Sequence, residues 1–215
     1  MKLYFSRNYN PRLAVAAARY LKSPIVFEFA RPFAPGQREK FRKLNPNLSI
    51  PILDLEDRTI WEADAIACYL SQLAGSDFWP TGEALPDIVR WLSWGYWNFV
   101  RGCDVVHFER VTRQRYGLGP VTPELVESGL GEFRGSAAIL EQHFASSDWL
   151  VGETVTYADF RLACVLPFAD IAGLPLAEFP RVEAWHERLM QIPAWRDPFE
   201  GLDAPELPPL GGSPA

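Results

Sequence analysis

The stretch Asn45-Pro46-Asn47-Leu48-Ser49-Ile50-Pro51-Ile52-Leu53 decides how the first part of the chain folds. A residue before proline is disfavoured in the helical region, so the turn at 45–47 ends a short helix predicted over 37–44. Pro51 then opens a short strand, and a second apolar run follows at 59–61. Two short apolar runs on either side of a charged turn predict an antiparallel hairpin.

The segments around this hairpin complete one small domain. Residues 2–6 are short, apolar and aromatic, as in a strand, and Pro11 at a helix start predicts a helix with Asn10 as its N-cap. A second strand is predicted over 25–29, and a strand–helix–strand crossover makes its two strands parallel. After the hairpin, residues 62–73 carry apolar side chains at helical spacing. The order β-α-β-α-β-β-α, with a proline opening the third strand, predicts a thioredoxin-like α/β domain.

The rest of the chain predicts a separate all-α domain. Residues 76–86 are rich in Gly, Pro, Ser and Asp and are typical of a linker. Long helices are predicted over 88–112 and 123–144, and Thr156 with Asp159 has the N-cap and N3 spacing of a capping box. We therefore expect an α/β domain over 1–75, the linker 76–86, an all-α domain over 87–201 and a flexible Pro- and Gly-rich tail over 202–215.

The composition excludes several classes of protein. The 215 residues carry 21 basic and 27 acidic side chains, and the net charge of −6 argues against nucleic acid or an anionic membrane as the main partner. No apolar run approaches the ~20 residues of a membrane span, and no signal peptide precedes the first strand, so a cytoplasmic protein is expected. Cys68, Cys103 and Cys164 are too far apart in the sequence to form a disulfide framework or a metal cluster.

Two motifs carry a resemblance to a known family. The stretch 45–53, followed by Trp61-Glu62-Ala63-Asp64-Ala65-Ile66-Ala67, resembles the glutathione-binding half of a cytosolic glutathione S-transferase of bacterial type. The resemblance implies a cis Ile50–Pro51 bond, which lets the Ile50 backbone pair with the cysteinyl part of glutathione. It also implies that the helix beginning near Glu62 receives the γ-glutamyl carboxylate at its N-terminus, while Glu62 pairs with the ammonium group. Ala63 replaces the usual serine, which removes one hydroxyl contact to that carboxylate.

The family stabilises the glutathione thiolate with a donor near the end of the first strand, and three residues are alternatives for that role. Phe5 stands where the tyrosine subtype has its hydroxyl, which argues against that subtype. Asn10 stands where the cysteine subtype has its cysteine and where one bacterial group uses an asparagine amide. Tyr9 stands where the serine subtype has its serine, and Ser6 is a further hydroxyl. We rank Asn10 first, then Tyr9, then Ser6, and the cysteine type is excluded.

The resemblance implies a homodimeric glutathione transferase acting in detoxification. Because no cysteine precedes Cys68, the reactive sulfur is expected to come from glutathione, which attacks a small hydrophobic electrophile. Trp94 and Trp97 are candidate walls of the hydrophobic substrate site, whereas Arg7 and Arg12 are expected to be solvated. Two alternatives stay open on this scaffold: a glutathione-dependent isomerase or dehalogenase, and a non-catalytic binding or scaffold protein. No metal is expected.

Overall fold

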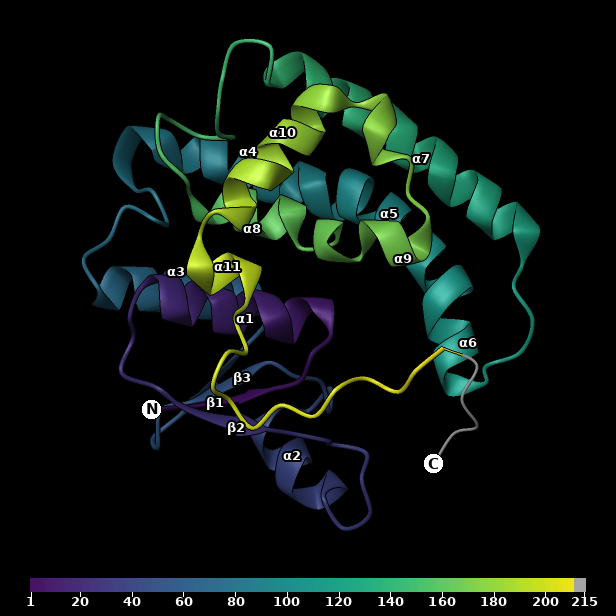
Figure 1. Cartoon of the computed structure of the whole chain (residues 1–215). Coiled ribbons are helices and arrows are strands. Elements are labelled where there is room, and N and C mark those ends of the chain that lie inside the picture. The colour runs from purple at the N-terminus through teal and green to yellow at the C-terminus, as the bar shows by residue number, and fades with distance from the viewer. Residues whose placement is uncertain (211–215) are drawn as a thin grey trace. The chain divides into compact units, whose positions relative to one another are not determined.

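The computed structural model describes residues 1–210, which separate into two compact units. The first unit comprises Met1–Pro80 together with Met190–Glu206, and the second comprises Thr81–Leu189 with the described residues after Glu206. Figure 1 labels their helices and strands. Within the described part of the chain, no helix has both the length and the apolar character needed to cross a bilayer. The flexible tail expected over 202–215 falls partly on residues 211–215, outside the described residues.

The first unit is built on a four-stranded mixed sheet with the order β2-β1-β3-β4. β1 and β2 run parallel, while β3 runs antiparallel to both β1 and β4. The strands are β1 (Lys2–Phe5), β2 (Val26–Phe29), β3 (Ile52–Asp54) and β4 (Thr59–Trp61). The predicted crossover and hairpin are therefore confirmed, and with them the thioredoxin-like order of elements.

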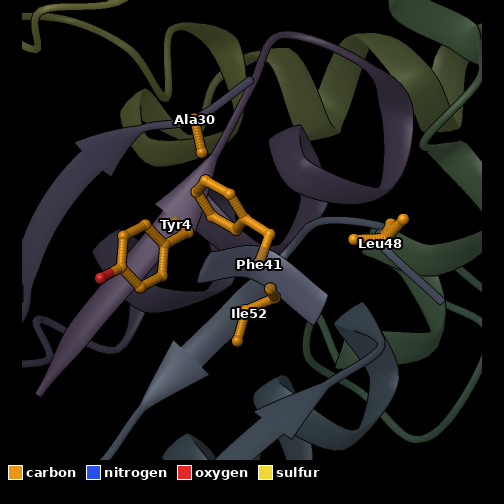
Figure 2. Packing of buried hydrophobic residues seen from close by; sticks show 5 residues of the cluster. All are labelled: Tyr4, Ala30, Phe41, Leu48 and Ile52. Carbon is orange, nitrogen blue, oxygen red and sulfur yellow. The ribbon is translucent and has the colours of Figure 1, made fainter. Parts of the chain in front are cut away.

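Helices cover both faces of this sheet. They are α1 (Tyr9–Tyr20), α2 (Arg38–Leu44) and α3 (Ala63–Leu73), and the short α11 (Pro193–Arg196) packs on α1. Alternate residues of a strand point to opposite faces, and Phe41 of α2 closes one face by packing on Tyr4 and Ile52, together with Ala30 and Leu48 (Figure 2). The rings of Tyr4 and Phe41 meet edge to face with 5.4 Å between their centroids. The packed pair α1 and α3 lies on the other face (Figure 1).

The first helix begins earlier than the sequence indicated. α1 starts at Tyr9 with Asn8 as its N-cap, so the prediction of Asn10 as N-cap is wrong. Pro11 is the third residue of the helix, a position where the missing N–H costs no intrahelical hydrogen bond. The N–H groups that point out of this helix end therefore belong to Tyr9 and Asn10.

The second unit is helical, and its longest element runs from Leu85 to Tyr116. It consists of α4 (Leu85–Gly95), α5 (Arg101–His107) and α6 (Arg113–Tyr116), joined by π-helical turns at Tyr96–Val100 and Phe108–Thr112. The sequence predicted the helix but not these turns, because one widened turn changes the apolar spacing too little to be recognised. Further helices are α7 (Pro123–His143), α8 (Tyr157–Ala163), α9 (Ala169–Ala172) and α10 (Pro180–Met190), with 3₁₀ turns at Gly82–Ala84, Leu166–Phe168 and Leu176–Glu178.

The predicted capping box at the start of α8 is confirmed. Thr156 is the N-cap, and Asp159 accepts its backbone N–H at 2.8 Å. The fully buried Asp159 also accepts the N–H of Leu150 at 2.9 Å and the indole N–H of Trp185 at 3.1 Å. Asp159 therefore ties α8 to the preceding loop and to α10, which is a structural role.

Two glycines allow α5 and α7 to pack at short range. A Cβ on Gly102 would lie 2.7 Å from the backbone nitrogen of Phe133, and a Cβ on Gly129 would lie 3.0 Å from the Gly102 carbonyl oxygen. Both separations are shorter than ordinary van der Waals contact. Gly131 and Gly135 of α7 instead face open space.

Replacing Gly102 by alanine is expected to lower the free energy of unfolding by about 2 kcal/mol, because the new methyl group forces two packed backbones apart. Urea denaturation measures this change. Gly135→Ala is the matched control, since it adds a methyl group in open space and should raise stability by up to about 1 kcal/mol through helix propensity. Equal effects of the two substitutions would show that the close approach of α5 and α7 does not limit stability.

Candidate functional site

The register of the sheet brings the predicted glutathione-binding residues to one edge. Tyr4 pairs with Ile52, and Ile52 pairs with Trp61, so these three residues form one row across β1, β3 and β4. Beyond this row the chain continues through Phe5 and Ser6 after β1, and through Glu62 and Ala63 after β4, while Ile50 and Pro51 precede β3. This edge is the carboxyl end of β1, where the chain enters α1, and the carboxyl end of β4, where it enters α3.

The loop before β3 is held in place by a buried asparagine. The Ile50–Pro51 peptide bond is cis, as the resemblance implied. The fully buried Asn45 donates from Nδ2 to the Ser49 carbonyl at 2.8 Å and accepts the Asn47 N–H at 3.0 Å. Ile50 packs against the cluster of Figure 2. The sequence reasoning treated Asn45 only as a helix end and missed this role, although an Asx residue directly before a proline is a known turn signal.

Glu62 links β4 to α3 in a backbone conformation that is rare for a glutamate. It is the N-cap of α3, with φ of 71° and ψ of 130°. Left-handed values cost energy in residues with a Cβ, and such residues cluster at binding sites. The side chain is exposed and makes no capping hydrogen bond. The N–H groups at this end of α3 point out of the helix and give it a partial positive charge, which suits a carboxylate. The buried Ala63 contributes its backbone there, and no hydroxyl.

The three candidate thiolate donors differ in the accessibility of their polar atoms. Ser6 is buried, and its Oγ is enclosed with no hydrogen-bond partner in the described part of the chain. Tyr9 is half-buried, and its hydroxyl oxygen is enclosed as well. Asn10 is half-buried at the second position of α1, where the helix end itself favours a nearby anion.

Arg7 and Arg12 are bound by the protein, so the expectation that they are solvated is wrong. Arg12 is buried, its guanidinium donates to the Trp195 carbonyl, and it lies 4.7 Å from the centroid of the Trp195 ring. Arg7 is half-buried and pairs with Glu206, with 2.7 Å between Nη2 and Oε1. Both contacts involve Met190–Glu206, and packing across so many residues of sequence leaves no local pattern to recognise.

The predicted substrate-site tryptophans lie on the second unit. Trp94 is half-buried and meets Trp91 edge to face, with 5.4 Å between ring centroids. Trp97 lies in the first π-helical turn, is 66% exposed and contacts Tyr96 at 5.2 Å. Trp91 is buried in the core. An exposed indole offers apolar surface to a ligand, and the substrate-site role of Trp94 and Trp97 stays a prediction. Within residues 1–210, no three His, Cys, Asp or Glu side chains are grouped so as to hold a metal ion.

Comparison with known proteins agrees with the fold described above. The family model "Glutathione S-transferase, C-terminal domain" matches residues 123–188. A glutathione S-transferase from Pseudomonas fluorescens Pf-5 superposes with a TM-score of 0.80 at 25% identity, over 90% of this chain and 96% of that one. The chain therefore shares the glutathione S-transferase fold, and residues 123–188 match the C-terminal domain of that family. A glutathione S-transferase-I bound with lactoylglutathione shares the fold, with a TM-score of 0.81 at 19% identity over 92% of this chain and 97% of that one.

The curated relatives of this chain carry two kinds of name. Elongation factor 1-gamma 3 of Oryza sativa subsp. japonica is 29% identical over 215 residues, which is 95% of this chain and 50% of that protein. Glutathione S-transferase 1 of Manduca sexta is 29% identical over 175 residues, which is 74% of this chain and 71% of that protein. The chain therefore spans about half the length of the elongation-factor relative.

Proposed function

We propose that the protein is a glutathione transferase that binds glutathione at the carboxyl end of β1 and stabilises its thiolate. One observation carries this proposal: Tyr4, Ile52 and Trp61 form one row across β1, β3 and β4, so Ser6, Ile50 and Glu62 lie close to the same end of the sheet. That edge is where α1 and α3 begin, so two helix N-termini are available for the two anionic groups of the ligand, the thiolate and the γ-glutamyl carboxylate. The lactoylglutathione bound to the glutathione S-transferase-I of the same fold supports this choice of ligand.

Each part of glutathione then has a protein partner. The Ile50 backbone pairs with the cysteinyl unit, the N-terminus of α3 receives the γ-glutamyl carboxylate, and Glu62 pairs with the ammonium group. A free thiol has a pKa near 8.5, and one charge-assisted hydrogen bond together with the N-terminus of α1 can lower it by about one to two units. The thiol proton leaves to water, the thiolate sulfur forms a bond to the electrophilic carbon, and the leaving group departs with its bonding electrons.

Calorimetric titration with glutathione and a conjugation assay with 1-chloro-2,4-dinitrobenzene test the proposal. We expect saturable binding below millimolar concentration and a product that contains one C–S bond in place of the C–Cl bond. No heat of binding at millimolar glutathione would overturn the proposal. Binding of glutathione without turnover of any electrophile would leave the non-catalytic alternative.

Replacing Glu62 by glutamine is expected to weaken glutathione binding about tenfold, because the side chain keeps its shape but loses the charge that faces the ammonium group. The dissociation constant from calorimetry measures this change. Glu56→Gln is the matched control, since Glu56 is also an exposed glutamate with positive φ, at 76°, but lies in the β3–β4 turn. Equal glutathione affinities of the two variants would show that Glu62 does not contact the ligand.

A non-catalytic binding or scaffold protein is the second candidate, and Ala63 favours it. The missing hydroxyl weakens the contact to the γ-glutamyl carboxylate by about 1–2 kcal/mol. A relative that is named as an elongation factor and not as a transferase points the same way. A glutathione-dependent isomerase or dehalogenase is a further alternative. Activity assays with a panel of substrates distinguish it from a transferase. The homodimer and the cytoplasmic location stay predictions, and light scattering of the purified chain tests the former.

A further inference from the structure

The segment Met190–Glu206 belongs to the first unit although residues 81–189 separate it from β1 and α1 in the sequence. Three arginines of the first twenty residues hold it. Besides the contacts of Arg12 with Trp195, the Arg19 guanidinium donates to the Glu200 carbonyl at 2.6 Å, and Arg7 donates from Nε to the Ala204 carbonyl at 2.9 Å. In Figure 1 this segment is the yellow part of the chain that passes beside α1 and β1. We call residues 195–206 the brace.

The brace contacts Phe5 and Arg7, the two residues on either side of Ser6. The ring of Phe199 stacks on the ring of Phe5, with 5.8 Å between centroids and 16° between planes. The Arg7 guanidinium lies 4.8 Å from the centroid of the same Phe199 ring and pairs with Glu206 at its outer end. Phe5 and Arg7 are thereby fixed in position, and with them residues 6–10, which form the turn before α1 and the first two positions of that helix.

We infer that the brace is a positioning element of the proposed thiolate site, acting through Arg7 on residues 6–10, which include Ser6, Tyr9 and Asn10. The inference rests on the proposed function. A hydrogen bond to a thiolate loses most of its strength when the donor is displaced or misaligned, so a donor on a loose turn stabilises the anion less than a donor on a fixed turn. The side chain of Arg7 is occupied by the brace, with bonds to Ala204 and Glu206, and it acts by holding the backbone.

The negative charge of Glu206 distinguishes positioning from direct electrostatics. Glu206 is negative, so if the residue acted only through its field, its removal would favour the thiolate and lower the thiol pKa of bound glutathione. If Glu206 instead anchors Arg7, its removal loosens the turn and raises that pKa. Glu206→Gln therefore gives opposite results under the two mechanisms. Its side chain is 81% exposed, so the substitution does not disturb a packed core.

The experiment measures the pH dependence of thiolate absorbance of glutathione bound to the full chain. We expect Glu206→Gln to raise the thiol pKa by about half a unit, equal to an approximately threefold loss of thiolate, and to leave the glutathione dissociation constant within about twofold. Arg7→Gln should act in the same direction. The control Glu200→Gln removes the same charge from the brace, and the described contacts of Glu200 use its backbone N–H and carbonyl and not its side chain, so it should behave as wild type.

Amide hydrogen exchange of the 6–10 turn gives an independent readout, and it should be faster in Glu206→Gln but not in Glu200→Gln. An unchanged or lowered thiol pKa in Glu206→Gln would refute the positioning role of the brace, and so would an unchanged amide exchange rate of residues 6–10. Either result would leave the proposed function intact. A wild-type protein that binds no glutathione at millimolar concentration would overturn the proposed function, and the inference with it.

Discussion

Replacing Asp159 by alanine is expected to lower the free energy of unfolding by about 4 kcal/mol. The carboxylate is fully buried and accepts hydrogen bonds from Leu150, Thr156 and Trp185. Alanine leaves these donors buried without an acceptor, and each such donor costs about 1–3 kcal/mol, part of which is recovered by relaxation. Urea denaturation followed by tryptophan fluorescence measures the loss.

The control for this prediction is Asp148→Ala, which makes the same substitution at an aspartate whose side chain is 81% exposed and pairs with Arg188 at 3.8 Å. An exposed pair of this kind contributes about 0–1 kcal/mol. A loss at Asp159 no larger than the loss at Asp148 would contradict the structural role of the capping box. If Asp159→Ala does not fold, Trp185→Phe removes a single hydrogen bond of the same network and should cost about 1–2 kcal/mol.

Asp159 also predicts a pH dependence of stability. Burial raises the pKa of its carboxyl group from the ordinary 3.8 to about 6, against the hydrogen bonds that lower it. The folded chain therefore holds this proton more tightly than the unfolded chain, and the contribution of Asp159 to stability falls as the pH rises from about 4 to about 6. The difference in unfolding free energy between wild type and Asp159→Asn should change by up to about 3 kcal/mol over this window. Measuring this difference at each pH removes the contributions of groups that titrate in both proteins. One such group is His107, because burial lowers its pKa to about 4.

Replacing Asn10 by alanine is expected to reduce conjugation about 10- to 100-fold at pH 6.5, because the thiol pKa of bound glutathione rises by about one to two units when its donor is lost. Asn10 is favoured over Ser6 and Tyr9 because the hydroxyl oxygens of those two residues are enclosed by the protein. The pH profile of kcat/KM measures the shift, and the rate should recover at high pH, where the thiol ionises without help.

Ser6→Ala and Tyr9→Phe are the matched controls, because each removes one enclosed hydroxyl group from the same turn. Both variants should keep activity within about threefold of wild type, as expected where no transition-state contact is lost. A loss of activity in either variant that matches the loss in Asn10→Ala would move the donor role to that residue. An Asn10→Ala variant with the wild-type pH profile would exclude Asn10.

The parts of the fold that could be predicted from sequence are those with a local signal. The apolar runs of the β3–β4 hairpin, the proline before β3 and the Thr156–Asp159 spacing each depend on neighbouring residues, and each appears in the structure. The resemblance placed Ile50, Pro51 and Glu62 in the site, and the sheet register brings these positions together.

Features that depend on distant residues could not be predicted. Arg12 looks like an exposed helix residue in the sequence, but its guanidinium is buried by Trp195, which lies 183 residues further along the chain. The N-cap is Asn8 and not the predicted Asn10, because a proline such as Pro11 is tolerated at the third helical position as well as at the first. The choice among Asn10, Tyr9 and Ser6 depends on side-chain burial, which periodicity does not encode.

The brace has a consequence for synthesis of the chain on the ribosome. A polypeptide emerges from its N-terminus, so β1 and α1 leave the exit tunnel long before Trp195 and Phe199. During that interval Phe5 cannot yet stack on Phe199, and Arg12 cannot yet donate to the Trp195 carbonyl. The first unit is thus completed last, after all helices of the second unit have been translated.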